Sequence, residues 1–279
     1  MQWWCSARGI PWRWSWQAYP GVWLAVLALG VAYLRWSRPR PGAPSQAFAA
    51  SPARRVGGWI GVALVWMALD WPGGPLGTGY LASVHAAQFL ALAMIAPPLL
   101  LRGIDGDRVR ALLDKHGAVA TIISATTQPL VAMLTFTIVM LSTHAPGVVD
   151  TLMRSQLGAF ALDLAWFASG LAFWWPVVIE VPVRKRFGPP MRMLYLFAGT
   201  QAHLYLSMWL LLAEFPAYGI YELAPRVTGL SALEDQQVAG GLLLTLGGTY
   251  VLAVISVLFF RWFEDPNPGS LHSSVHPPA

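Results

Sequence analysis

The chain has 279 residues, of which 56% are hydrophobic and only 11% are charged, and its formal net charge is +5. Ordinary soluble domains carry about 25% charged residues, so this composition excludes a water-soluble body of this size. The basic residues fall in short clusters between long apolar runs. That pattern indicates membrane topology rather than nucleic-acid binding, and it predicts an all-α, polytopic membrane helical bundle.

Seven apolar segments approach the roughly 20 residues that a membrane-spanning helix requires. The fourth segment contains two threonines followed by Gln128 and Pro129, so we expect it to end, kink or shorten there. Together the segments define a transmembrane domain at residues 19–263. They predict seven transmembrane helices, at about residues 19–36, 56–71, 81–101, 119–142, 156–179, 191–213 and 238–260.

The two ends of the chain differ from this domain. Residues 1–18 are rich in tryptophan and predict an interfacial segment, because the amphipathic indole favours the membrane–water boundary. Residues 264–279 are polar and rich in proline, and they predict a disordered tail that includes His272 and His276. The single cysteine, Cys5, excludes an internal disulfide.

The distribution of basic residues predicts the orientation of the bundle. Fourteen of the 18 Lys and Arg residues follow the first, third, fifth and seventh segments. An excess of Lys and Arg marks the cytoplasmic side of a membrane protein. We therefore expect the N-terminus outside and the C-terminus in the cytoplasm, which requires an odd number of spans.

This orientation places most polar side chains of the predicted helices in the outer half of the membrane. An ionisable group at that depth is costly, so each one is a candidate functional residue. Asp163 lies about two turns below the outer surface, and no Lys or Arg lies inside a span to pair with it. The set consists of His85, Gln88, His144, Asp163, Gln201, His203, Asp235 and Gln236.

Histidine and carboxylate side chains together indicate a metal site. Imidazole suits copper, zinc and iron, and a nearby carboxylate can orient the ring. Structural roles compete with this interpretation: Asp235 is a candidate helix N-cap, and His203 is a candidate for an interhelical hydrogen bond. The candidate metal ligands are His85, His144, Asp163 and His203, and the supporting polar residues are Gln88, Gln201, Asp235 and Gln236.

Four stretches of the sequence carry a family resemblance. SVHAAQFLALAMIAPPLLLRG is similar to an H-x-x-Q-H segment followed by a P-P-L-L helix end, and THAPGVVD is similar to W-H-x-P. FWWPVV is similar to F-W-W-P, and LEDQQVAGGLLL is similar to D-Q-x-x-G-G. In this order and over about residues 19–262, they resemble the multi-pass CtaG family of cytochrome c oxidase assembly factors described from caa-type oxidases.

The resemblance implies a non-enzymatic role in maturing a haem-copper oxidase in the bacterial cytoplasmic (inner) membrane, with assistance to copper insertion from the periplasmic side. It implies oxidase subunits or periplasmic copper donors as partners, besides the lipid bilayer. Among the candidates it marks His85, Gln88, His144, Asp235 and Gln236.

The chain departs from the family pattern at four places, one of which is the absence of a methionine that the family often has early in the last helix. Phe89 stands where the family often has a histidine, and Thr143 stands where it has a tryptophan. The segment 156–179 has no histidine where the family has one or two, and Asp163 is a candidate substitute.

The main alternative is a membrane transporter or channel for a metal ion or a small solute. That function requires a polar path through the inner half as well, where the sequence offers little beyond Thr126, Thr127 and Gln128. An intramembrane enzyme is disfavoured, because the sequence contains no H-E-x-x-H, no G-x-S-x-G and no phosphate-binding loop, and we expect no catalytic residues.

Overall fold

The computed structural model describes residues 2–39, 50–115, 117–179 and 188–264, and this part of the chain contains helices and no strand. The all-helical fold class is therefore confirmed. The predicted tail lies outside the described residues apart from Glu264, and so do His272 and His276.

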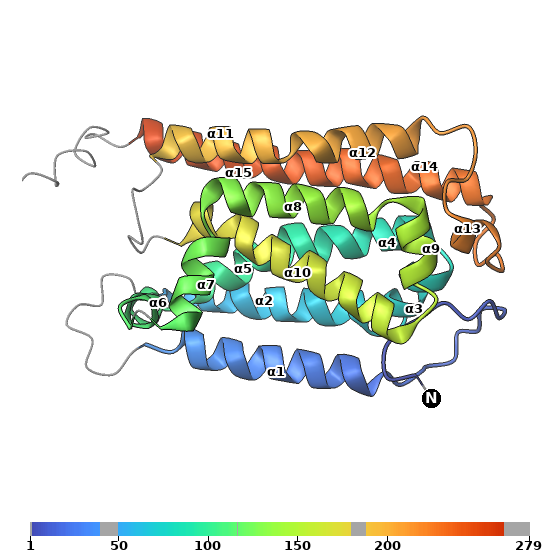
Figure 1. Ribbon diagram of the computed structural model, residues 1–279, viewed down its shortest axis with the longest axis horizontal. Coiled ribbons are helices and arrows are strands. Elements are labelled where there is room, and N and C mark those ends of the chain that lie inside the picture. The colour runs from blue at the N-terminus through green and yellow to red at the C-terminus, as the bar shows by residue number, and fades with distance from the viewer. Residues whose placement is uncertain (1, 40–49, 116, 180–187, 265–279) are drawn as a thin grey trace, which may run out of the picture.

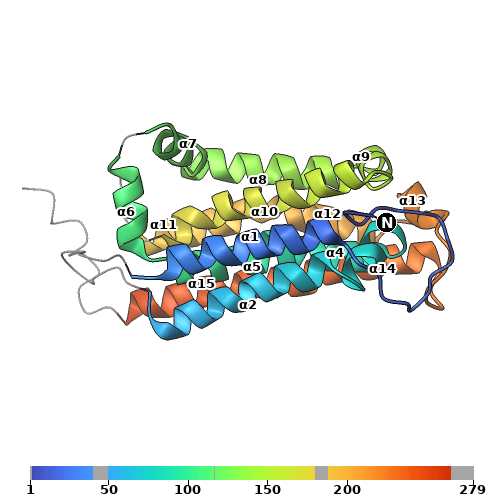
Figure 2. The ribbon, with the colours of Figure 1, turned by 90° about the horizontal axis from the view of Figure 1, so that it is seen from below.

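Long helices run side by side along the longest axis of the molecule, and each of the seven predicted segments is helical (Figures 1 and 2). Two of these helices change to π-helical geometry part-way along their length. The stretches are α1 (Pro20–Ser37), α2 (Pro52–Leu69), α4–η1–α5 (Ala82–Phe89, Leu90–Ile95 and Ala96–Gly103), α8 (Pro129–Thr143), α10 (Gln156–Val178), α11–α12 (Pro189–Gly199 and Gln201–Leu211) and α14–η2–α15 (Ala232–Leu242, Leu243–Gly247 and Gly248–Phe263).

By length and composition, four of these stretches are apolar enough to cross a membrane: Pro20–Ser37, Ala82–Gly103, Gln156–Val178 and Ala232–Phe263. A fifth candidate is the bent pair formed by α7 (Ala118–Thr126) and α8. The structure thus supports four or five of the seven predicted spans. The other spans stay a prediction.

The predicted break in the fourth segment is confirmed. Helices α7 and α8 meet at 73°, and α7 turns away from the axis of α8 (Figures 1 and 2). Gln128 is extended, with φ −60° and ψ 131°, because the ring of Pro129 disfavours helical geometry in the residue before it. Pro129 then occupies the first position of α8, where its missing N–H costs nothing.

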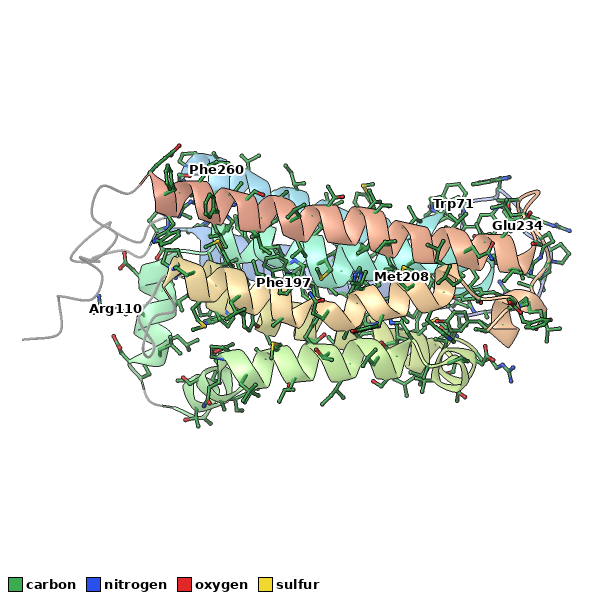
Figure 3. All side chains as sticks on the ribbon, turned by 90° about the horizontal axis from the view of Figure 1, so that it is seen from above. Trp71, Arg110, Phe197, Met208, Glu234 and Phe260 are labelled. Atoms are coloured by element: carbon green, nitrogen blue, oxygen red, sulfur yellow. The ribbon has the colours of Figure 1, made fainter. Side chains whose placement is uncertain are left out.

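The two ends of the bundle differ in character. Three short helices, α3 (Gly73–Gly79), α9 (Pro146–Leu152) and α13 (Gly219–Glu222), lie at one end together with the N-terminal segment, and we call this the capped end (Figure 1). The other end carries α6 (Gly106–Leu113) and is called the basic end, because helices terminate or begin there with Arg35, Arg54, Arg102, Arg192 and Arg261. Figure 3 shows Glu234 at the capped end and Arg110 at the basic end.

Between the two ends, the outer flank of the bundle is apolar. Leu24 and Leu27 on α1 are 67% and 63% exposed, and Phe197 and Phe260 are each 59% exposed. Figure 3 shows Phe197, Met208 and Phe260 along this flank. The bundle therefore has charged side chains at its ends and exposed apolar side chains between them. A water-soluble helical bundle has the opposite distribution, because its exposed face is polar.

Glycines allow the central helices to approach closely. A Cβ atom at Gly170 of α10 would lie 2.5 Å from the carbonyl oxygen of Ala93 in η1. A Cβ atom at Gly240 of α14 would lie 2.6 Å from the backbone nitrogen of Leu211 in α12. Side chains at these positions would force the helices apart, so the two glycines permit backbone-to-backbone packing, as small residues do in membrane bundles.

The N-terminal segment is more than the predicted interfacial belt. Trp14 and Trp16 are 67% and 61% exposed, as an interfacial role requires, but Trp4 and Cys5 are buried. The Gln156 side-chain oxygen at the start of α10 accepts hydrogen bonds from the backbone nitrogens of Trp3 and Trp4 at 2.7 and 3.2 Å. The segment therefore folds back onto the capped end and forms part of its core.

We predict that Cys5 reacts slowly with alkylating reagents in the folded protein. Burial raises the pKa of its thiol well above the ordinary value, and the nearby carboxylates of Asp163 and Asp70 raise it further. Since the thiolate is the reactive form, alkylation at neutral pH should be roughly tenfold slower or more than after denaturation, and it should accelerate as the pH rises. Mass spectrometry after timed exposure to iodoacetamide measures this rate.

The matched control moves the thiol to an exposed position of the same segment, with Cys5→Ser combined with Ser15→Cys. That variant should react equally fast folded and denatured. Rapid labelling of Cys5 in the folded protein would contradict the packed N-terminal segment.

Candidate histidine site

His85 and His144 meet at the capped end of the bundle. His85 lies in the second turn of α4, and His144 is the C-cap of α8. Their ring centroids are 5.8 Å apart, and the two side chains are 4% and 3% exposed. Trp166 of α10 packs against both rings, at centroid distances of 4.8 and 5.5 Å. Three separate helices thus enclose one pair of imidazoles.

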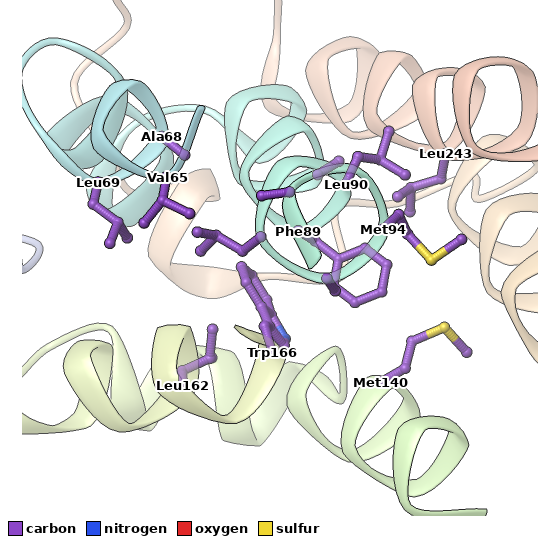
Figure 4. Close-up of a cluster of buried hydrophobic side chains, with 14 of the residues drawn as sticks. Val65, Ala68, Leu69, Phe89, Leu90, Met94, Met140, Leu162, Trp166 and Leu243 are labelled. Carbon is purple, nitrogen blue, oxygen red and sulfur yellow. The ribbon is translucent and has the colours of Figure 1, made fainter. Parts of the chain in front are cut away.

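His203 lies near the pair, and its ring packs against Phe89, which also packs against His144. The Phe89 ring lies 4.9 Å from that of His144 and 6.1 Å from that of His203, between centroids. Figure 4 shows Phe89 and Trp166 in the core between the ribbons of neighbouring helices. Gly247 in η2 lies against the His203 ring, so close that a side chain there would clash with it.

Each of the three histidines has a buried ring nitrogen that makes no hydrogen bond to a described residue. The Nε2 atoms of His85, His144 and His203 are buried and have no hydrogen-bond partner among the described residues. A buried polar atom left without a partner costs about 1–3 kcal/mol, so natural proteins rarely retain one without a reason. Three of the eight such side-chain atoms among the described residues are the Nε2 atoms of these histidines.

The hydrogen bond of His144 defines which of its ring nitrogens can act as a ligand. Its Nδ1 atom lies 2.8 Å from the carbonyl oxygen of Met140, which can only accept. Nδ1 therefore carries the proton in the neutral ring, and the lone pair is on Nε2. A backbone carbonyl bonded to one nitrogen is the usual arrangement that orients a metal-binding histidine through the other.

The predicted ligand Asp163 faces a different partner. Its carboxylate accepts a hydrogen bond of 2.8 Å from the indole nitrogen of Trp4, which ties the N-terminal segment to α10. Within the described residues, no group of three or more His, Cys, Asp or Glu side chains is placed to hold a metal ion. The four predicted ligands are thus a close pair, His85 and His144, with His203 packed against Phe89 and Asp163 directed to Trp4.

Asp235 lies in α14 but caps the start of α4. Its carboxylate accepts hydrogen bonds from the backbone nitrogens of Ala82 and Ser83, at 2.6 and 3.4 Å, and from the Ser83 hydroxyl. These are the free N–H groups at the start of α4, where a negative charge also complements the helix dipole. Helix α14 uses Ser231 and Glu234 as its own capping box.

The predicted supporting glutamines divide into two kinds. The Gln88 side chain donates to the carbonyl oxygen of Ala68 at 2.7 Å, which ties α4 to the end of α2. Gln236 accepts from the backbone nitrogen of Ala217 at 2.7 Å and holds the segment that leads into α13. Gln201 donates to Phe197 in the preceding turn, so it does not contribute to the cluster.

Sequence reasoning missed the residues that cover the pair. The Tyr218 hydroxyl donates to the carbonyl oxygen of His144 at 2.9 Å, and the Tyr221 hydroxyl donates to that of Gly77 at 2.6 Å. Burial raises the pKa of both phenols, so both remain neutral donors. Asp150 of α9 holds α13 in place by accepting from the backbone nitrogens of Gly219 and Ile220. These residues lie in short connecting segments, where no periodic pattern could mark them.

Comparison with protein families identifies the family of the chain. A family model described as cytochrome c oxidase caa3 assembly factor (Caa3_CtaG) matches residues 27–265, which is most of the chain. The chain belongs to this family. No curated protein and no solved structure matches it.

The structure shows how the residues that carry the family resemblance are arranged. His85 and Gln88 lie on α4, His144 packs against His85 from the end of α8, and Asp235 of α14 accepts hydrogen bonds from the start of α4. Gln236 follows Asp235 on α14 and holds the segment that leads into α13. Three of the five make hydrogen bonds that position helices. The two histidines retain an unpartnered Nε2 atom each.

We predict that Asp235→Ala destabilises the protein by about 1–3 kcal/mol, because it leaves buried backbone N–H groups of α4 without an acceptor. Asp235→Asn retains an acceptor oxygen and should cost less. Thermal unfolding of the purified chain in detergent measures the difference.

Glu234→Ala is the control for this prediction, since it removes the neighbouring carboxylate and affects only the capping box of α14. An equal loss of stability in Glu234→Ala and Asp235→Ala would contradict the assigned role of Asp235.

Proposed function

We propose that this chain is an integral membrane assembly factor for a haem-copper cytochrome c oxidase, and that it assists copper insertion from the periplasmic side. Membership of the caa3 assembly factor family supports the oxidase and a non-catalytic role. The observation that carries the copper step is the buried pair of His85 and His144, each with an unpartnered Nε2 atom.

The proposed topology has seven spans in the bacterial cytoplasmic membrane, with the N-terminus in the periplasm and the C-terminus in the cytoplasm. The apolar flank supports a position in a membrane, and the concentration of arginines at the basic end supports this orientation. Helices α2 and α11–α12 lie parallel to the four long apolar stretches, so they complete the bundle (Figure 1). The capped end then faces the periplasm, where copper donors would approach.

Copper in its reduced state is the metal that suits a pair of neutral imidazoles. Cu(I) is a soft d¹⁰ ion that accepts low coordination numbers, and imidazole is among its ligands. A site with only two ligands leaves room for an incoming ligand to bind before one of the histidines is released. Such a site favours transfer of the ion to an oxidase subunit over permanent retention.

The surroundings of the pair fit this role. Trp166 and Phe89 exclude water from the imidazoles, and Tyr218 and Tyr221 close the site from the side of α13. Since the histidines are almost fully buried, entry of copper requires displacement of a covering segment. The short helix α13 is the smallest such segment, because four residues form it.

The structure gives little support to the alternative of a transporter. Two of the three polar residues named for the inner half are Thr126 and Thr127, and their hydroxyls donate to the carbonyl oxygens of Ile122 and Ile123 in their own helix at 2.9 and 2.6 Å. Hydroxyls used in this way do not provide a chain of polar groups along a conduction path.

We predict that the double variant His85→Ala, His144→Ala fails to restore copper to the oxidase in a strain that lacks this chain. Without either imidazole the proposed site has no ligand, so the purified oxidase should show a lowered ratio of copper to haem. The wild-type chain should restore the ratio, and so should Gln201→Ala, which alters a glutamine outside the cluster. Full restoration by the double variant would refute the copper step.

We also predict that Phe89→His tightens Cu(I) binding by the purified chain. The side chain at position 89 packs against both His144 and His203, so an imidazole there adds a third nitrogen ligand. The Cu(I) dissociation constant, measured by competition with a chromophoric chelator, should fall by about tenfold or more, equivalent to about 1.4 kcal/mol.

Asp163→Asn is the matched control in this assay, because its side chain is bonded to Trp4 rather than to the histidines. It should leave the dissociation constant unchanged. A loss of Cu(I) binding in Asp163→Asn would place the carboxylate among the ligands.

A further inference from the structure

A cavity of about 420 Å³ opens at the basic end, on the side of the bundle away from the histidines. It lies between α5, α10, α11 and α15, next to the start of α2. Its inner wall is apolar and includes Leu101, Trp174 and Val177, which are buried. The volume is within the range of roughly 300–1,000 Å³ that small-molecule sites occupy.

Four arginines line this cavity, and each comes from a different helix: Arg54, Arg102, Arg192 and Arg261. None of the described lining residues is an aspartate or a glutamate. The cavity therefore combines an apolar wall with a strongly cationic rim, which is complementary to an amphiphile with a negatively charged head.

Helix dipoles explain only part of this arrangement. Arg102 and Arg261 lie in the last turns of α5 and α15, where a cation is favourable. Arg54 and Arg192 lie in the first turns of α2 and α11, where the positive end of the dipole disfavours a cation. The rule that cytoplasmic loops are basic accounts for arginines at this end, but it does not require them to converge on one cavity.

We propose that this cavity binds the phosphate group of an anionic phospholipid of the cytoplasmic leaflet, with the guanidinium groups of Arg54 and Arg261 beside the phosphate. Guanidinium groups suit phosphate because their planar N–H donors match its oxygens. Basic pockets between transmembrane helices on the cytoplasmic side are known to take anionic headgroups. The proposal rests on the proposed topology and is independent of the copper site.

The apolar surface beside the cavity favours a lipid over a soluble phosphate. Val257 lines the cavity and is 49% exposed, and Phe260 one turn further on is 59% exposed. Trp262 adds an amphipathic indole at the rim, as is common at a membrane interface. The cavity is smaller than a whole phospholipid, so the headgroup occupies it and the acyl chains continue along the exposed face of α15.

Native mass spectrometry of the full chain in detergent tests the proposal. With phosphatidylglycerol and phosphatidylcholine added in equal amounts, the wild type should retain one phosphatidylglycerol preferentially. The double variant Arg54→Gln, Arg261→Gln should bind it about five- to tenfold more weakly per arginine removed. The control Arg110→Gln, Lys115→Gln removes the same charge at the same end, outside the cavity, and should bind as the wild type does.

A second pair of variants tests the cavity itself without a change of charge. Val257→Trp should obstruct the opening and reduce phosphatidylglycerol retention, whereas Leu252→Trp, on the exposed face of α15 outside the cavity, should not. Equal retention of both lipids, or equal loss in the control and cavity variants, would overturn the proposal. Displacement of the lipid by inorganic phosphate would also overturn it and assign the site to a soluble anion.

Discussion

The carboxylate of Asp235 accepts hydrogen bonds from the first turn of α4, and this contact joins two helices whose residues are 153 positions apart in the chain. It satisfies N–H groups that would otherwise be buried without an acceptor, and it adds a negative charge at the positive end of the helix dipole. The start of α4 is thereby fixed, and with it the positions of His85, Gln88 and Phe89. The contribution of α4 to the histidine cluster depends on this contact.

The polar residues of the capped end have two distinct tasks. Asp150, Asp163 and Asp235 each accept hydrogen bonds from a segment distant in sequence, so the carboxylates hold the structure together. The imidazoles keep their Nε2 atoms free of such bonds among the described residues. The proposed copper site would need this division, because ligands that also held helices together could not exchange partners without loosening the fold.

The fold was predictable where a single stretch of chain determines it. Apolar runs predicted the long helices, and Pro129 predicted the break between α7 and α8, because both effects are local. The site was predictable only in its location. The partner of Asp163 is Trp4, which is 159 positions away, and no spacing rule connects them. The cover formed by Tyr218 and Tyr221 and the π-helical turns η1 and η2 depend in the same way on tertiary packing.

In the proposed function, His85 and His144 are the ligands of one Cu(I) ion. X-ray absorption at the copper K edge, recorded on the purified chain loaded with one equivalent of Cu(I), tests this claim most directly. We expect two nitrogen scatterers around the copper, with the multiple-scattering pattern of imidazole. We expect this pattern to be lost in His85→Ala. Sulfur among the scatterers, or a spectrum unchanged in His85→Ala, would contradict this claim.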